Sequence, residues 1–115
     1  MVEDVWSSVD DYFGRLLLGH DPVLDSTLKA NTAAGLPAIG VSPHQGTMLH
    51  LLARSIGARR ILEVGTLGGY STIWLARALP PDGRLITCEI DPTHAQVARS
   101  NLAEAGLSGV TEVRV

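Results

Sequence analysis

Two acidic residues and a glycine-rich turn have the types and spacing expected of a ligand-binding site. Glu63 ends the apolar run RRILE just before the turn VGTLGG, and Glu89 stands at the end of the next apolar run, RLITCEI. If both runs are parallel strands, their carboxyl ends lie at the edge of the sheet where α/β proteins bind ligands. A carboxylate there can accept the hydroxyls of a ribose, whereas an anion beside the turn would repel a phosphate. The pattern therefore favours a nucleoside whose other end is neutral or cationic.

Competing nucleotide motifs fit the turn less well. The dinucleotide fingerprint G-x-G-x-x-G needs glycines where this chain has Leu67 and Tyr70, and the sequence contains no Gly-Lys-Ser/Thr of a Walker loop. Gly68 and Gly69 would instead let the following helix approach the strand closely. S-adenosylmethionine, an adenosine with a sulfonium and an amino-acid end, suits the two acids. A Rossmann-type NAD(P)-dependent oxidoreductase and a non-catalytic cofactor-binding or oligomerisation module remain alternatives, since glycine turns follow many strands.

Hydrophobic periodicity divides the chain into a helical first half and an alternating second half. Helices are predicted over residues 3–18, 23–34 and 43–57. Beyond them, strands are predicted at RRILEV, RLITCEI and VTEVRV, and helices at YSTIWLARAL and over residues 91–105. This β-α-β-α-β order predicts an α/β fold with a parallel sheet. We expect a helical segment over residues 1–57 and the first half of a doubly wound cofactor-binding domain over residues 58–115.

Helix ends carry clear local signals. Residues 19–22, Gly-His-Asp-Pro, should end the first helix. Ser42, Pro43 and Gln45 have the spacing of a capping box with proline in the first turn, so a helix should begin there. The buried face of that helix is expected to consist of Met48, Leu49, Leu51, Leu52 and Ile56.

The predicted sheet has an unusual edge. In a doubly wound sheet the first strand normally lies in the centre. Here only two strands follow the first strand, RILEV, so this apolar strand would lie at the edge. Native proteins avoid such edges, so we expect the sequence to be the N-terminal portion of a longer protein. The alternative is a complete small domain that covers the edge by dimerising or with its N-terminal helices.

The runs LEVGTLGGYS and LITCEIDP carry a specific family resemblance. The chain resembles the cation-dependent O-methyltransferases of the catechol and caffeoyl-CoA type over roughly residues 3–115. The resemblance implies a Rossmann-like S-adenosylmethionine-dependent methyltransferase fold, of which this chain holds the N-terminal half. It also implies methyl transfer to a hydroxyl of a catechol-like or phenylpropanoid small molecule.

The positions of the cofactor contacts also follow from the resemblance. Val41 would pack on the cofactor, Glu63 would face its amino group, and Ser71 would bond its carboxylate. Glu89 would accept the ribose diol, and the backbone of the turn would add further contacts. The implied set is Val41, Glu63, Gly65, Thr66, Leu67, Gly69, Ser71 and Glu89.

A divalent metal, expected to be magnesium, is the second cofactor that the family implies. It would bind two adjacent oxygens of the substrate and promote ionisation of one hydroxyl, which would then attack the sulfonium methyl. In the family its ligands and the catalytic group lie on later strands, so we expect no catalytic and no metal-binding residue in this chain. The four histidines are scattered and are interpreted as surface residues, and Cys88 as an inert buried thiol.

Composition limits the remaining classes. With 115 residues, 45% of them hydrophobic, the chain is long enough for one domain with a core. Its net charge of -3 gives no basic surface for nucleic acid. The acidic N-terminus is unlike a secretory signal, no apolar run reaches the length of a membrane span, and a single cysteine fits a reducing compartment. We therefore expect a soluble, cytoplasmic protein without nucleic-acid or membrane partners.

The first predicted helix suggests self-association. Trp6, Val9, Phe13 and Leu17 fall on one stripe that little else in the chain could cover. Large apolar patches seldom stay exposed on soluble monomers. We therefore expect a homodimer with twofold symmetry.

The expected lack of metal ligands leads to a test of activity. A purified protein of these 115 residues should transfer no methyl group from S-adenosylmethionine to a catechol, with or without added magnesium, because nothing in it would hold the metal and the diol together. Mass spectrometry of the catechol after incubation measures the product. Metal-dependent turnover by this chain alone would contradict the expectation.

Overall fold

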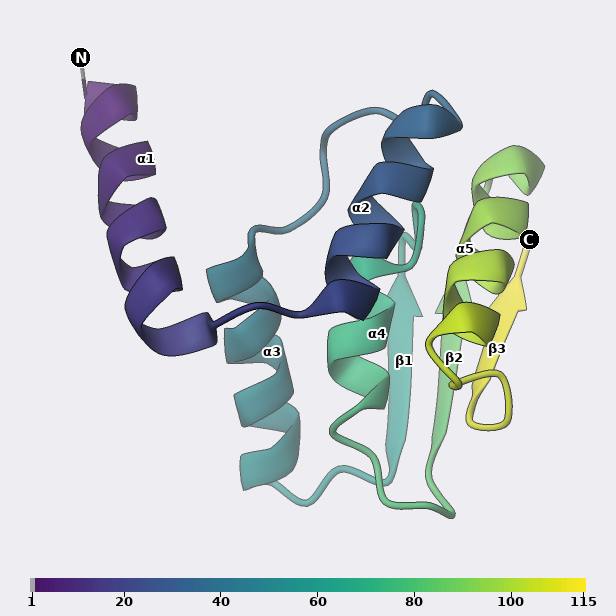
Figure 1. Ribbon diagram of the computed structural model, residues 1–115. Coiled ribbons are helices and arrows are strands. Elements are labelled where there is room, and N and C mark those ends of the chain that lie inside the picture. The colour runs from purple at the N-terminus through teal and green to yellow at the C-terminus, as the bar shows by residue number, and fades with distance from the viewer. Residues whose placement is uncertain (1) are drawn as a thin grey trace.

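The computed structural model describes residues 2–115 (Figure 1). In chain order its elements are α1 (Val2–Phe13), the π-helix η1 (Gly14–Leu18), α2 (Pro22–Ala33), α3 (Pro43–Ser55), β1 (Arg60–Val64), α4 (Tyr70–Ala76), β2 (Arg84–Cys88), α5 (Pro92–Glu104) and β3 (Thr111–Arg114). Helices occupy the first half of the chain and the β-α-β-α-β order the second, as the periodicity predicted. The division into segments 1–57 and 58–115 stays a prediction.

The strands form one parallel sheet in the order β1-β2-β3. In the parallel register Val64 lies opposite Cys88, which lies opposite Arg114, so the carboxyl ends of the strands meet at one edge. Two further bonds extend the ladder there: the Gly65 N–H donates to the Cys88 carbonyl and the Glu89 N–H to the Arg114 carbonyl, both at 2.8 Å. The predicted α/β fold is confirmed, and this edge carries both acids.

Helices α2, α4 and α5 lie on one face of the sheet (Figure 1). The core between these helices consists of Leu24, Tyr70, Ile73 and Leu102, with Leu85 of β2 buried beneath them. On the other face, Leu62 is 70% and Val64 84% exposed. The prediction that β1 is a buried strand is therefore wrong for one of its faces, because the described helices pack from one side only. β1 lies at the edge of the described sheet, as predicted.

Helix α3 begins where the sequence predicted but buries a different face. The Gln45 N–H donates to the Ser42 hydroxyl at 3.2 Å, and the Ser42 N–H donates to the Gln45 side chain at 2.9 Å, so the capping box is present. The expected buried face is wrong: Met48, Leu51, Leu52 and Ile56 are all more than half exposed. Gly46 and Ala53 are buried in their place, because α3 approaches α4 so closely that a Cβ added at Gly46 would lie 2.2 Å from the Trp74 ring.

The first helix projects from the rest of the molecule (Figure 1). It continues from α1 through the wider turns of η1 to Leu18, so the predicted helix over residues 3–18 is confirmed with a changed last turn. No residue of α1 is buried. A hydrogen bond of 2.8 Å between the His44 ring and the Asp10 carbonyl joins it to α3. Among residues 2–115, no helix combines the length and apolar character that a membrane crossing requires.

Asp21 lies in the segment that was predicted only to end the first helix, but it also joins two later helices. Its carboxylate accepts the N–H groups of Val23 and Leu24, both at 3.1 Å, and so caps the start of α2. The same carboxylate accepts from Arg77, at the end of α4, at 2.6 Å. The hydrogen bond from Arg77, together with the helix N–H groups, outweighs the effect of burial and lowers the pKa of Asp21. One side chain thus fixes α2 against α4.

Two substitutions separate the cap from the ion pair. Asp21→Ala should lower the free energy of unfolding by about 1–2 kcal/mol, because both contacts are lost, whereas Asp21→Asn keeps a capping oxygen and should lose less. Since folding lowers the pKa of Asp21, the ionised form stabilises the fold. Its contribution is therefore complete at neutral pH and is lost as the pH falls below the ordinary value of 3.8 towards the lower folded value.

Urea denaturation followed by circular dichroism between pH 7 and pH 3 measures both effects. The difference between the natural protein and Asp21→Asn should shrink as the pH falls. A difference that is independent of pH would show that the Arg77 pair contributes nothing.

Candidate functional site

The glycine-rich turn after β1 has an unusual backbone that Glu89 holds in place. Leu67 has a φ of 52°, a left-handed conformation that side chains other than glycine seldom adopt, and it lies between Gly65 (φ 93°) and Gly69 (φ 88°). The Leu67 N–H donates to Oε1 of Glu89 at 2.8 Å. The turn that follows β1 is therefore anchored directly to the acid that follows β2.

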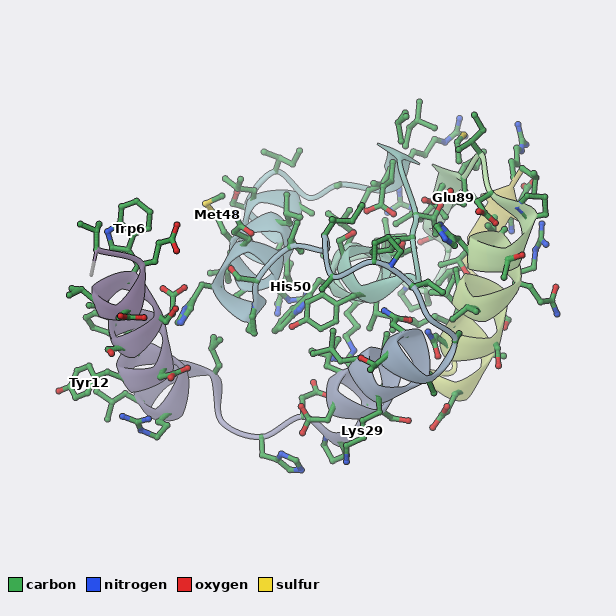
Figure 2. The ribbon with its side chains drawn as sticks, turned by 90° about the horizontal axis from the view of Figure 1, so that it is seen from above. Trp6, Tyr12, Lys29, Met48, His50 and Glu89 are labelled. Carbon is green, nitrogen blue, oxygen red and sulfur yellow. The ribbon has the colours of Figure 1, made fainter. Side chains whose placement is uncertain are left out.

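Glu89 is itself fixed and charged. Its second oxygen accepts the Asp91 N–H at 3.0 Å, and its side chain is 9% exposed. Burial alone would raise the pKa of Glu89, but the backbone N–H groups of Asp91 and Leu67 outweigh it and lower the pKa below the usual value. His94 Nδ1 lies 3.7 Å from the same carboxylate. Figure 2 shows Glu89 beside the sheet, at the opposite end of the molecule from Trp6 and Tyr12.

A cavity of about 510 Å³ lies at this carboxyl edge of the sheet. It is lined by Ile39, Gly40, Val41, Gly65, Thr66, Leu67, Tyr70, Ser71, Glu89, Ile90, Asp91 and His94. Six of the eight residues implied by the family resemblance are among them, and they come from the loop before α3, the turn, the start of α4 and the end of β2. The fold therefore brings most of the expected set into one place.

Glu63 lies behind the cavity wall. Its Oε2 accepts the Ser71 hydroxyl at 2.7 Å, and Ser71 itself lines the cavity. Oε1 accepts the hydroxyls of Thr72 at 2.5 Å and Thr87 at 2.8 Å. The Ser71 hydroxyl therefore lies between Glu63 and the cavity, while the other contacts of Glu63 hold its carboxylate in place.

Gly68 and Gly69 have different roles in the turn. A Cβ added at Gly69 would lie 3.5 Å from the Ala98 backbone on α5, and one added at Gly68 would overlap the Asn31 side chain on α2. Gly68 therefore lets α2 approach the turn, whereas Gly69 is needed for its left-handed backbone, and the expected approach of α4 to β1 stays a prediction. Gly69 supports the site from outside the cavity.

Sequence reasoning missed the side chain that holds the turn from behind. The Asn101 amide, on α5 and 3% exposed, donates to the Gly68 carbonyl at 2.8 Å and to the Asn31 amide oxygen at 3.0 Å. A signal was present, because Asn101 stands next to Leu102 and three residues after Ala98 on the apolar side of its helix. A buried amide in such a position requires a partner.

The missed lining residues define the character of the cavity. Ile39 and Ile90 add exposed apolar surface, and His94 adds an imidazole beside Glu89. Burial raises the pKa of Tyr70, so its phenol stays neutral near pH 7. None of the described lining residues is Lys or Arg. Such a cavity suits a neutral nucleoside with a cationic end better than a pyrophosphate.

A metal site would need several His, Cys, Asp or Glu side chains close together. Within residues 2–115, no three His, Cys, Asp or Glu side chains gather where they could share a metal ion. The described residues therefore form no metal site, and the magnesium ion that the resemblance places on later strands stays a prediction.

The parallel sheet with a glycine-rich turn and a cavity at the carboxyl ends of its strands is a Rossmann-like arrangement, and comparison with known proteins supplies the family. The chain belongs to the O-methyltransferase family, whose model matches residues 19–115. The resemblance predicted from LEVGTLGGYS and LITCEIDP is confirmed.

Individual relatives agree in sequence and structure. The chain is 51% identical to the catechol O-methyltransferase of Niastella koreensis over 114 residues, covering 99% of this chain and 52% of that protein. The O-methyltransferase from Bacillus cereus, solved in complex with SAH, has a TM-score of 0.96 and 52% identity, covering 99% of this chain and 51% of that one. TomG from Streptomyces achromogenes, solved with SAM, has a TM-score of 0.93 and 53% identity, covering 100% and 52%. The chain spans about half the length of these relatives.

Proposed function

We propose that this protein, at its natural full length, transfers a methyl group from S-adenosylmethionine to a hydroxyl of a catechol-like or phenylpropanoid small molecule. The observation that carries the proposal is the cavity around Glu89, which combines a fixed carboxylate, apolar walls and a glycine-rich turn, with no Lys or Arg among its described lining. Membership of the O-methyltransferase family supports the same reaction.

The hydrogen-bonding capacity of Glu89 fits a ribose. An ionised carboxylate offers about four lone-pair sites. Backbone N–H groups of Leu67 and Asp91 occupy one site on each oxygen. The remaining lone pairs can accept hydroxyls of a ribose, and the apolar side chains of Val41 and Ile90 lie in the same cavity to cover the adenine.

Ser71 and Glu63 suit the amino-acid end of the cofactor. Ser71 lines the cavity next to this end of the cofactor, and the negative charge of Glu63 behind it would attract the ammonium group. To bond the cofactor carboxylate, as the resemblance implies, the Ser71 hydroxyl would turn its single proton from Glu63 to that carboxylate. Gly65 and Thr66 present the turn to the same space. The bound cofactor supplies an electrophilic methyl group, and the residues of this chain bind and orient it.

The relatives support the choice of cofactor and substrate class. The Bacillus cereus relative was solved with SAH and the Streptomyces relative with SAM, at 52% and 53% identity. The Niastella relative is named for catechol. We propose a small hydroxyl-bearing acceptor of this kind, and a magnesium ion held by residues of the full-length protein outside 2–115. We also propose a cytoplasmic location, which the single, unpaired Cys88 supports.

Substitution of Glu89 tests the cofactor assignment. Glu89→Ala should weaken binding of S-adenosylhomocysteine by about 1.5–3 kcal/mol, because hydrogen bonds to a charged group are lost. Isothermal titration calorimetry on the full-length protein measures this, and NADH should not bind. Glu104→Ala, at the exposed end of α5, is the control and should keep the natural affinity. Unchanged affinity in Glu89→Ala would remove Glu89 from the site.

We further propose that the full-length protein is a homodimer that uses α1. The helix carries exposed apolar side chains along its length: Val2, Val5, Trp6, Val9, Tyr12 and Phe13. Figure 2 shows Trp6 and Tyr12 pointing away from the rest of the molecule. A second copy could cover this surface with the same surface of its own, as twofold symmetry requires.

Replacing two of these aromatic residues tests the dimer. Trp6→Ser with Phe13→Ser should shift the full-length protein towards monomer in sedimentation velocity at micromolar concentration, because apolar contact area is lost. Affinity for S-adenosylhomocysteine should stay nearly unchanged. Ser7→Ala, on the polar side of α1, is the control and should leave the dimer intact. A natural protein that sediments as a monomer would contradict the proposal.

A further inference from the structure

Hydroxyl groups from two elements converge on Glu63. Thr72, in the first turn of α4, and Thr87, in β2, both donate to Oε1, at 2.5 and 2.8 Å. Ser71 donates to Oε2 at 2.7 Å. Thr72 and Thr87 are completely buried, whereas Ser71 lies at the cavity. The carboxylate is therefore held from behind by two threonines that have no access to a ligand.

The donor of each hydrogen bond in this network can be assigned. A hydroxyl has a single proton to donate, and Thr87 gives its proton to Glu63. The 2.6 Å contact between Thr87 and Thr66 therefore has Thr66 as the donor. Thr66 is 2% exposed, so water does not replace it. Ser71, Thr72 and Thr87 thus each donate to Glu63, and Thr66 donates to Thr87, so the Glu63 carboxylate is the acceptor in all of its hydroxyl contacts.

The Glu63 carboxylate is held in a fixed position but is not paired with a cationic side chain. Its hydrogen-bond partners are neutral hydroxyls, in contrast to Asp21, whose charge is paired with Arg77. Within a partly buried site, an oriented but unpaired negative charge attracts a cation that enters the cavity next to it. The threonines thus hold the Glu63 carboxylate without pairing its charge, so that the charge can act on a cation in the cavity next to Ser71.

We propose that Thr72 and Thr87 are positioning residues for cofactor recognition: they hold Glu63 so that its charge acts on the ammonium end of S-adenosylmethionine. The inference rests on the proposed function, and it extends the site by two buried residues that contact neither cofactor nor substrate. It predicts that their hydroxyls matter for the amino-acid end of the cofactor and not for the nucleoside end, which is held by Glu89 on the other side of the turn.

The test compares two ligands on the full-length protein by isothermal titration calorimetry. S-adenosylhomocysteine has the amino-acid end, and 5′-methylthioadenosine has the same nucleoside and sulfur without it. Thr87→Val and Thr72→Val should each weaken binding of S-adenosylhomocysteine roughly tenfold and leave that of 5′-methylthioadenosine within about twofold. Thr87→Ser and Thr72→Ser keep the hydroxyl and should restore affinity.

Each outcome decides the inference. Equal weakening of both ligands would mean that the threonines serve only the fold, and no weakening of either would mean that Glu63 needs no positioning; both results overturn the proposal. If Thr87→Val does not fold, Thr72→Val decides alone, because Thr72 lies outside the sheet.

Glu63→Gln separates this proposal from the proposed function. If it weakens S-adenosylhomocysteine selectively while the two valine variants do not, only the positioning role is wrong. If the natural protein binds neither ligand, the proposed function itself is wrong.

Discussion

The hydrogen bond from the Leu67 N–H to Glu89 is the contact on which the site depends. A left-handed conformation at a residue other than glycine costs about 1–3 kcal/mol and persists only when its surroundings hold it. Glu89 supplies that restraint, and its own position is fixed by the Asp91 N–H. One bond therefore shapes the turn and places both the Leu67 side chain and the Glu89 carboxylate in the cavity wall.

Close approach of helices supports this arrangement from behind. Gly68 leaves room for α2 to close over the turn, and the buried Asn101 amide joins the Gly68 carbonyl to Asn31. Gly46 does the same for α3 beneath the Trp74 ring. Because a Cβ at Gly46 or Gly68 would overlap its neighbour, the positions of the helices and the form of the cavity depend on these small residues.

The carboxylates of the molecule show how the same chemical group is used in two ways. Asp21 forms an ion pair with Arg77 and caps the start of α2, and so stabilises the fold. Glu63 is surrounded by neutral hydroxyls, and Glu89 by backbone N–H groups, so both keep a net charge beside the cavity. Partners that donate hydrogen bonds without carrying a full charge hold a carboxylate in place and leave it able to act on a ligand.

The sequence by itself determined the order of the elements, the capping box at Ser42 and the placing of two acids at neighbouring strand ends. These are consequences of local periodicity and of contacts three residues apart, and parallel strands then meet at a common edge. Only the tertiary structure decided that α3 buries Gly46 and not Met48, that Glu63 stands behind Ser71, and that Asn101 holds the turn. The reason is that these contacts join residues distant in the chain, and local spacing does not specify which neighbour will pack against a given face.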